Sequence, residues 1–100
     1  HENRGLNEHI RDVTRRTARA GFIALGIDLL SRQGGTGQFT EPTQQTAAYN
    51  RTTPAQRLAD MRKSVEYLRT LGDVRHDRIG TVGFCAGGGN VWALAGAGDD

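Results

Sequence analysis

The stretch TVGFCAGGGN, residues 81–90, places the only cysteine of the chain between an apolar run and a cluster of glycines. The run 79–84 is short, rich in β-forming residues and interrupted by glycine, so it predicts a strand. Residues 86–97 predict a helix, although each glycine inside a helix costs about 1 kcal/mol relative to alanine. The stretch therefore predicts a strand, a sharp turn at Cys85 and a helix.

A strand, the pattern Gly-x-Cys-x-Gly and a helix, in this order, are typical of a nucleophile elbow, with Cys85 at the position where serine often stands. Such a turn is so tight that a Cβ atom at position 83 or 87 is expected to collide with nearby backbone. The thiol then faces the N-terminus of the helix, where unpaired N–H groups and the helix dipole favour a thiolate. The backbone N–H of Ala86 points to the same place and can stabilise an oxyanion.

Two other interpretations of the glycine cluster compete with the elbow. A dinucleotide-binding loop has the pattern GxGxxG, and Cys85 stands where the middle glycine lets the backbone approach a pyrophosphate. A P-loop also fits poorly, because no Gly-Lys-Ser/Thr sequence follows the cluster. A buried, chemically inert cysteine in a glycine-rich turn remains the structural alternative to a nucleophile.

The rest of the chain predicts helices around one more strand. Asn7 is a suitable N-cap for a helix over 8–20, and the nearly continuous apolar run 22–30 predicts a strand that is buried on both faces. Thr53 and Pro54 predict the start of a helix over 54–71. Residues 31–52 show no sustained periodicity, although a short helix around 43–50 fits. Helices alternating with buried strands predict α/β layering around a parallel sheet.

Composition narrows the class of protein. The chain has 100 residues, a formal net charge of +2 and 36% hydrophobic residues, which suits one globular domain. Its basic residues are dispersed, so nucleic-acid binding is not indicated. One cysteine forms no internal disulfide and suggests no metal site, which favours a reducing, cytoplasmic location. No apolar run approaches the length of a membrane span.

Three segments carry a resemblance to a known family. HENRGLNEHIRDV (1–13), GFIALGIDLLSRQGG (21–35) and IGTVGFCAGGG (79–89) resemble, in order and spacing, the dienelactone hydrolase family, which is the cysteine-nucleophile branch of the α/β-hydrolases. The resemblance implies a partial α/β-hydrolase fold, a parallel sheet flanked by helices and truncated at both ends. It also implies that 1–100 form the central part of a single hydrolase domain. The implied substrate is a small lactone or carboxylic ester, cleaved through a thioester without a metal or an organic cofactor.

The resemblance also implies a role for several residues. Cys85 matches the nucleophile, and Glu2 matches an acidic residue that holds the resting thiol and then exchanges partners when substrate arrives. Asn3 supplies a second oxyanion N–H beside that of Ala86, and Arg32 matches an arginine that binds the substrate carboxylate. Each has a simpler alternative, because Glu2 can be an exposed terminal acid, Asn3 a turn residue and Arg32 a surface arginine.

The sequence departs from the family pattern after the elbow. The triad acid and the histidine base of the family follow the nucleophile, yet no histidine follows Cys85. His9 falls on a predicted surface helix and His76 in a turn. His1 is close to Glu2 but in the wrong position for the family's base, and Asp28 is assigned a structural role. We therefore expect this chain to carry the nucleophile without its base and to be inactive alone.

The resemblance has a consequence for stability. In the family fold, a strand that ends just before Glu2 lies between the strands at 22–28 and 79–84, and the chain lacks it. Two strands without the one between them have unpaired edges. We therefore expect poor stability of the isolated chain and self-association through exposed sheet edges. This expectation keeps open a second function, a truncated, non-catalytic remnant that acts as a binding or assembly module.

Overall fold

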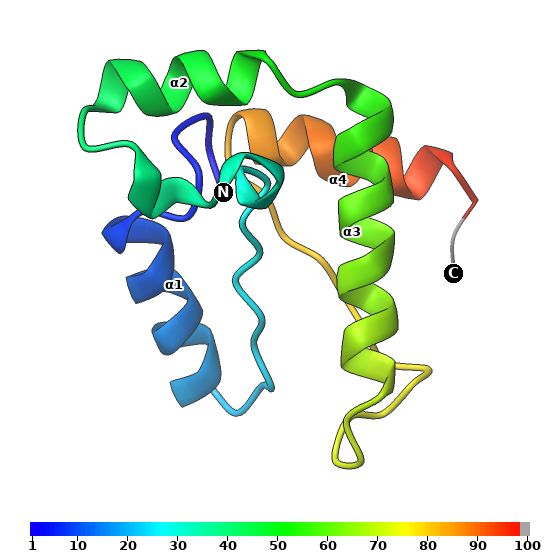
Figure 1. Ribbon diagram of the computed structural model, residues 1–100. Helices are drawn as coiled ribbons and strands as arrows, with labels where there is room; N and C mark the ends of the chain where they lie inside the picture. Colours follow the sequence, from blue (N-terminus) through cyan, green and yellow to red (C-terminus); the bar gives the residue numbers. More distant parts are fainter. Residues whose placement is uncertain (99–100) are drawn as a thin grey trace.

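The computed structural model describes residues 1–98 and consists of short helices joined by long irregular segments (Figure 1). Its elements are α1 (Glu8–Arg19), the 3₁₀ turns η1 (Ser31–Gln33) and η2 (Thr36–Gln38), α2 (Pro42–Asn50), α3 (Pro54–Arg69) and α4 (Ala86–Gly96). Helix α3 packs against α4. Helix α2 lies across the end of the molecule where α3 begins.

Local capping explains where the two longest helices begin. The side chain of Asn7 accepts a hydrogen bond from the N–H of Ile10 at 3.1 Å and starts α1. Thr53 starts α3 with a reciprocal capping box, in which the Gln56 N–H donates to Thr53 Oγ1 at 3.1 Å and the Thr53 N–H donates to Gln56 Oε1 at 3.0 Å. The helices predicted over 8–20, 54–71 and 86–97 are confirmed, with ends that differ by one or two residues.

The predicted parallel sheet flanked by helices is wrong for the part of the chain that the structure describes. Residues 22–28 and 79–84 are extended, but neither forms a strand. Both run toward the N-terminus of the chain, and no backbone ladder joins them (Figure 1). An apolar run favours extended backbone, whereas a strand also needs a neighbour about 5 Å away to pair with its N–H and C=O groups. Residues 1–98 supply no such neighbour.

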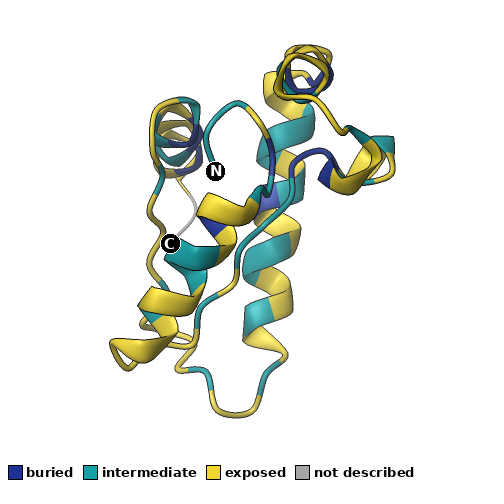
Figure 2. Cartoon of the chain, turned by 90° about the vertical axis from the view of Figure 1, so that its left-hand side faces the viewer, coloured by how far each residue is buried: buried dark blue, intermediate teal, exposed yellow. Residues whose placement is uncertain are grey.

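The extended segments consequently expose side chains that the sequence predicts to be buried. Phe22 is 66% exposed and Val82 is 68% exposed. Figure 2 shows that exposed and half-buried residues dominate both segments, while buried residues gather near the middle of the molecule. The hydrophobic contribution of these side chains to folding is correspondingly small.

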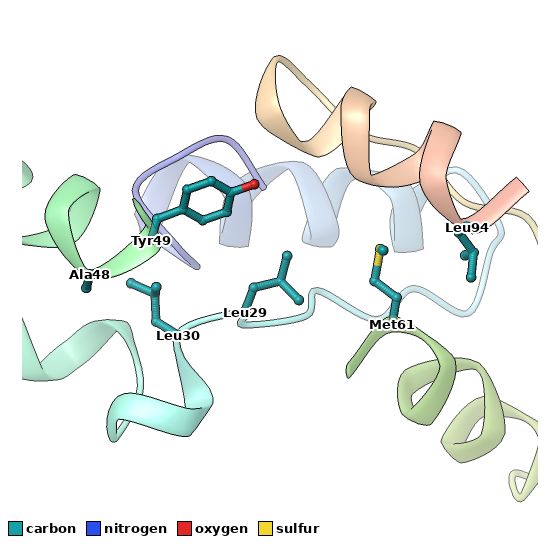
Figure 3. Packing of buried hydrophobic residues seen from close by; sticks show 6 residues of the cluster. All are labelled: Leu29, Leu30, Ala48, Tyr49, Met61 and Leu94. Atoms are coloured by element: carbon teal, nitrogen blue, oxygen red, sulfur yellow. The ribbon is translucent and has the colours of Figure 1, made fainter. Parts of the chain in front are cut away.

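The hydrophobic core lies where α2, α3 and α4 meet the end of the first extended segment. Its buried side chains come from all four parts of the chain (Figure 3): Leu29, Leu30, Ala48, Tyr49, Met61 and Leu94. Met61, on α3, is buried in this core. The core anchors one side of α4 and therefore the turn that precedes it.

Asp28 holds the first residues of the chain against the loop after the core. Its carboxylate accepts hydrogen bonds from the N–H of Leu30 and from both the N–H and the hydroxyl of Thr36, at 2.7–2.9 Å. Thr36 Oγ1 in turn accepts from the N–H of Leu6 at 2.8 Å. Gly5 has φ +75°, and an added Cβ there lies 2.1 Å from Thr36 Oγ1. Asp28 therefore has the structural role that the sequence indicated.

Candidate active site

Cys85 occupies a strained corner between the extended segment 79–84 and α4. Its φ of 56° and ψ of −117° make it the one non-glycine residue with positive φ among residues 1–98. A side chain in such a region of backbone space costs roughly 1–3 kcal/mol. The residue is the N-cap of α4 and is exposed to solvent. Cys85 is therefore not buried, as the structural alternative required.

Glycine is required on both sides of Cys85 because the turn brings backbone into van der Waals contact. An added Cβ at Gly83 lies 2.1 Å from the carbonyl oxygen of Gly87, and one at Gly87 lies 2.3 Å from the carbonyl oxygen of His1. The turn closes with a hydrogen bond of 2.9 Å from the Gly87 N–H to the Phe84 carbonyl. The collision expected at positions 83 and 87 is thus present.

The first residues of the chain lie against the elbow. The contact between Gly87 and the His1 carbonyl brings the peptide group that leads into Glu2 to the start of α4. Glu2 and Asn3 are both half-buried. Within residues 1–98, no hydrogen bond joins the Glu2 carboxylate or Asn3 to Cys85. The structure therefore places the segment of Glu2 and Asn3 next to the turn without a direct bond to the thiol.

Arg32 lies apart from the elbow and is already paired. Its Nε and Nη2 donate to the two carboxylate oxygens of Asp60 at 3.0 and 2.9 Å, a bidentate geometry. This hydrogen-bonded ion pair raises the pKa of Arg32 above its usual value. Both residues line an open hollow of about 480 Å³ between residues 25–32 and α3, and none of Cys85, Glu2 and Asn3 lines it.

A polar network that the sequence patterns did not reveal fixes the first half of α4. Asn90 donates to the hydroxyl of Tyr49 at 3.1 Å and accepts from Nε of Arg57 at 3.1 Å. Arg57 also donates to the carbonyl and hydroxyl of Thr52 and lies over the ring of Tyr49. The one signal in the sequence is a polar Asn90 in an otherwise apolar helix. The network ties α2 and α3 to the helix that Cys85 caps.

The other histidines, His9 on α1 and His76 in a turn, are both exposed. Among residues 1–98, no cluster of three or more His, Cys, Asp or Glu side chains is arranged to hold a metal ion. In the same residues, no helix is both long enough and apolar enough to cross a membrane.

Comparison with known proteins identifies the family of this chain. The profile of the dienelactone hydrolase family matches residues 1–100. The chain belongs to this family. The α/β-hydrolase fold expected for a dienelactone hydrolase is consistent with that membership, although residues 1–98 form helices without a sheet.

Relatives in the dienelactone hydrolase family have names that point to lactone chemistry. The chain is 36% identical over 92 residues to a protein of Methylorubrum extorquens named "Putative carboxymethylenebutenolidase". The aligned region covers 91% of this chain and 32% of that protein. It is 37% identical over 89 residues to the "Probable 2-oxo-3-(5-oxofuran-2-ylidene)propanoate lactonase" of a Bradyrhizobium species. The aligned region covers 84% of this chain and 34% of that protein.

A shorter match is more similar. The chain is 66% identical over 35 residues to a protein of Escherichia coli named "Putative hydrolase fragment YghX". The aligned region covers 35% of this chain and 30% of that protein. The chain spans about a third of the length of the curated relatives that it matches. No solved structure matches it significantly.

Proposed function

We propose that this chain carries the nucleophile of a hydrolase that cleaves a lactone or carboxylic ester through Cys85. The observation that supports this proposal is the exposed thiol at φ +56°, on a turn that glycine alone allows at positions 83 and 87. Strain of this kind persists where the surrounding structure enforces it and is concentrated at functional sites. The family membership and the lactonase name of one relative supply the substrate class.

The proposed reaction has two stages. Glu2 accepts the thiol proton, and Sγ of Cys85 attacks the carbonyl carbon of the substrate, while the N–H groups of Ala86 and Asn3 stabilise the oxyanion. The C–O bond of the lactone or ester then breaks, the leaving oxygen takes the proton from Glu2, and a thioester remains on Cys85. Water attacks the thioester, releasing a carboxylic acid and restoring the thiol. No residue of this chain is assigned as the base for the water.

Arg32 is proposed to select substrates that carry a second carboxylate. Nε and Nη2 of Arg32 donate to Asp60, whereas Nη1 takes no part in that ion pair. A guanidinium with a remaining N–H edge can bind a carboxylate without giving up its first partner. This role requires the substrate to extend from the elbow to the hollow between residues 25–32 and α3.

Acylation of Cys85 tests the proposed function. The chain is incubated with a nitrophenyl ester, and the thioester is measured by intact mass. We expect an adduct on Cys85 that forms at least about tenfold faster than on N-acetylcysteine, because oxyanion donors accelerate such attacks by large factors. Cys85→Ala, which removes the only thiol, is the control and should give no adduct. A rate equal to that of the free thiol contradicts the proposal.

The same assay tests Arg32. We expect an ester that bears a second carboxylate to react faster than a neutral ester of the same size, and Arg32→Gln to remove this preference. Arg51→Gln, which changes another exposed arginine, is the matched control and should keep the preference. Equal loss in both variants would assign the effect to overall charge rather than to Arg32.

A second candidate function is a non-catalytic assembly module whose partner is another copy of this chain. The observation that favours it is the pair of extended segments with unpaired backbone and exposed Phe22 and Val82. Such edges pair readily with another chain. This candidate predicts association without acylation, so the acylation experiment separates the two functions.

A further inference from the structure

The imidazole of His1 bridges two distant parts of the backbone. Its Nδ1 lies 2.5 Å from the carbonyl oxygen of Glu2, and the N–H of Leu29 donates to its Nε2 at 3.0 Å. An Nε2 that accepts a hydrogen bond carries no proton, so the proton of the neutral ring is on Nδ1 and is donated to Glu2. Both bonds therefore require neutral imidazole in one tautomer.

The same residue contacts the two elements next to the elbow. The ring of His1 meets the ring of Tyr49 edge-on at a centroid distance of 6.0 Å. Its carbonyl oxygen packs against Gly87, two residues after the nucleophile. Tyr49 is in turn bonded to Asn90 on α4. His1 thus contacts both Tyr49 on α2 and the turn at the start of α4.

We propose that His1 is a positioning residue: its neutral imidazole holds Glu2 and Asn3 beside Cys85, and protonation at Nε2 releases them. A protonated ring presents an N–H to the N–H of Leu29, so the bond is lost, and the donor is left without an acceptor in a residue that is 2% exposed. Histidine is the side chain that ordinarily changes charge between about pH 5 and 8.

Other groups around His1 also titrate or carry charge, and the test must separate them. On its own segment are Glu2 and the α-amino group, whose pKa burial lowers. The neighbouring segment contributes Asp28, α2 contributes Tyr49, α3 contributes Arg57 over the Tyr49 ring, and α4 contributes Cys85 at its start. His1→Gln keeps all of these groups. Its carboxamide offers one acceptor and one donor, as neutral imidazole does, but does not titrate.

The bridge is tested by NMR on the nitrogen-labelled chain between about pH 5 and pH 8. We expect the Leu29 amide shift to follow the titration of the His1 ring, and to stay constant in His1→Gln. The Ile10 amide, which is bonded to the side chain of Asn7, is the internal control and should not respond. A Leu29 amide that ignores the His1 titration, or that titrates equally in His1→Gln, overturns the bridge and with it the proposal.

The effect on the elbow is read from the rate at which iodoacetamide alkylates Cys85. The alkylation rate of the wild-type chain is divided by that of His1→Gln at each pH. This ratio cancels the pH dependence of the thiol itself, which both chains share. We expect this ratio to rise about threefold on acidification, with the midpoint of the Leu29 amide, because release of the Glu2 segment from the start of α4 leaves the thiol more accessible. A flat ratio overturns the positioning role.

This inference rests on the proposed function only where it assigns Glu2 and Asn3 to the reacting groups. A failure of the proposed function appears as the absence of a thioester on Cys85, which leaves the response of the Leu29 amide unchanged. The two failures are therefore distinguishable.

Discussion

At the scale of single residues, the site depends on backbone that few residue types tolerate. Cys85 has positive φ, and Gly83 and Gly87 have no room for a Cβ atom. Left-handed backbone is unfavourable for every residue except glycine. A cysteine at this position, where glycine would be unstrained, is the feature on which the proposed nucleophile rests.

Replacing Cys85 by glycine tests the strain directly. We expect Cys85→Gly to be more stable than Cys85→Ala by about 1 kcal/mol, because alanine keeps the Cβ atom in the unfavourable region and glycine does not. Urea unfolding followed by circular dichroism measures the difference. The opposite order of stability would show that the turn does not strain residue 85.

Gly87 and Gly89 form a matched pair within α4. Gly87→Ala should destabilise the chain by about 1–3 kcal/mol, since its new methyl group meets the His1 carbonyl at 2.3 Å. Gly89→Ala meets nothing within 4 Å and should stabilise α4 by up to about 1 kcal/mol. Urea midpoints of the two variants give the comparison. If both variants are stabilised, the first residues do not lie against the elbow.

At the scale of elements, α4 is a weak helix that the polar network of Tyr49, Asn90 and Arg57 supports. Its first turn contains consecutive glycines. Ala86 is only half-buried against the core, and the buried core contact through Leu94 lies two turns further on. The hydrogen bonds of Asn90 to α2 and α3 are closer to Cys85 than that core contact is along the helix. We infer that this network, more than helix propensity, determines where the elbow sits.

Asn90→Ala tests this inference. The change leaves the buried hydroxyl of Tyr49 and Nε of Arg57 without a partner, which should cost about 1–3 kcal/mol. Trp92→Ala, at a position that is 80% exposed on the same helix, should change stability by less than about 0.5 kcal/mol. Amide hydrogen exchange of α4 in both variants provides the measurement. Similar losses in the two variants would mean that the network does not support α4.

At the scale of the whole molecule, the extended segments 22–28 and 79–84 determine the behaviour of the chain. They converge near the N-terminus without pairing, and five of their large apolar side chains are exposed: Phe22, Ile23, Leu25, Val82 and Phe84. The hydrophobic core, which includes the fully buried Leu30, is small for a chain of 100 residues. A domain that buries a small fraction of its apolar surface has a small margin of stability.

We therefore expect the isolated chain to unfold without a sharp thermal transition at low concentration and to self-associate as concentration rises. Sedimentation analysis and calorimetry across a range of concentrations measure both. Val82→Lys, which places a charge on one exposed edge, should reduce association, while Thr70→Lys at an exposed helix end is the charge control. A cooperative transition of a monomer at all concentrations contradicts this expectation.

The helices and the elbow could be predicted from the sequence because their causes are local. Asn7 and Thr53 cap their helices with bonds that span three residues, and Gly83 and Gly87 flank a turn of five. The sheet could not be predicted correctly, because the apolar runs of 22–28 and 79–84 indicate extended backbone but not the presence of a partner. Likewise, nothing local indicated that His1 meets Leu29 or that Asn90 meets Tyr49.

The amino-acid sequence by itself determined helices α1, α3 and α4, the tight turn around Cys85 and the membership of the dienelactone hydrolase family. The tertiary structure alone decided that no sheet forms among residues 1–98, that Arg32 pairs with Asp60, and that His1 lies against the elbow. The reason is the range of the interactions. Helix caps and turns satisfy their hydrogen bonds within a few residues, whereas strand pairing, ion pairs and ring contacts need partners that are distant in sequence.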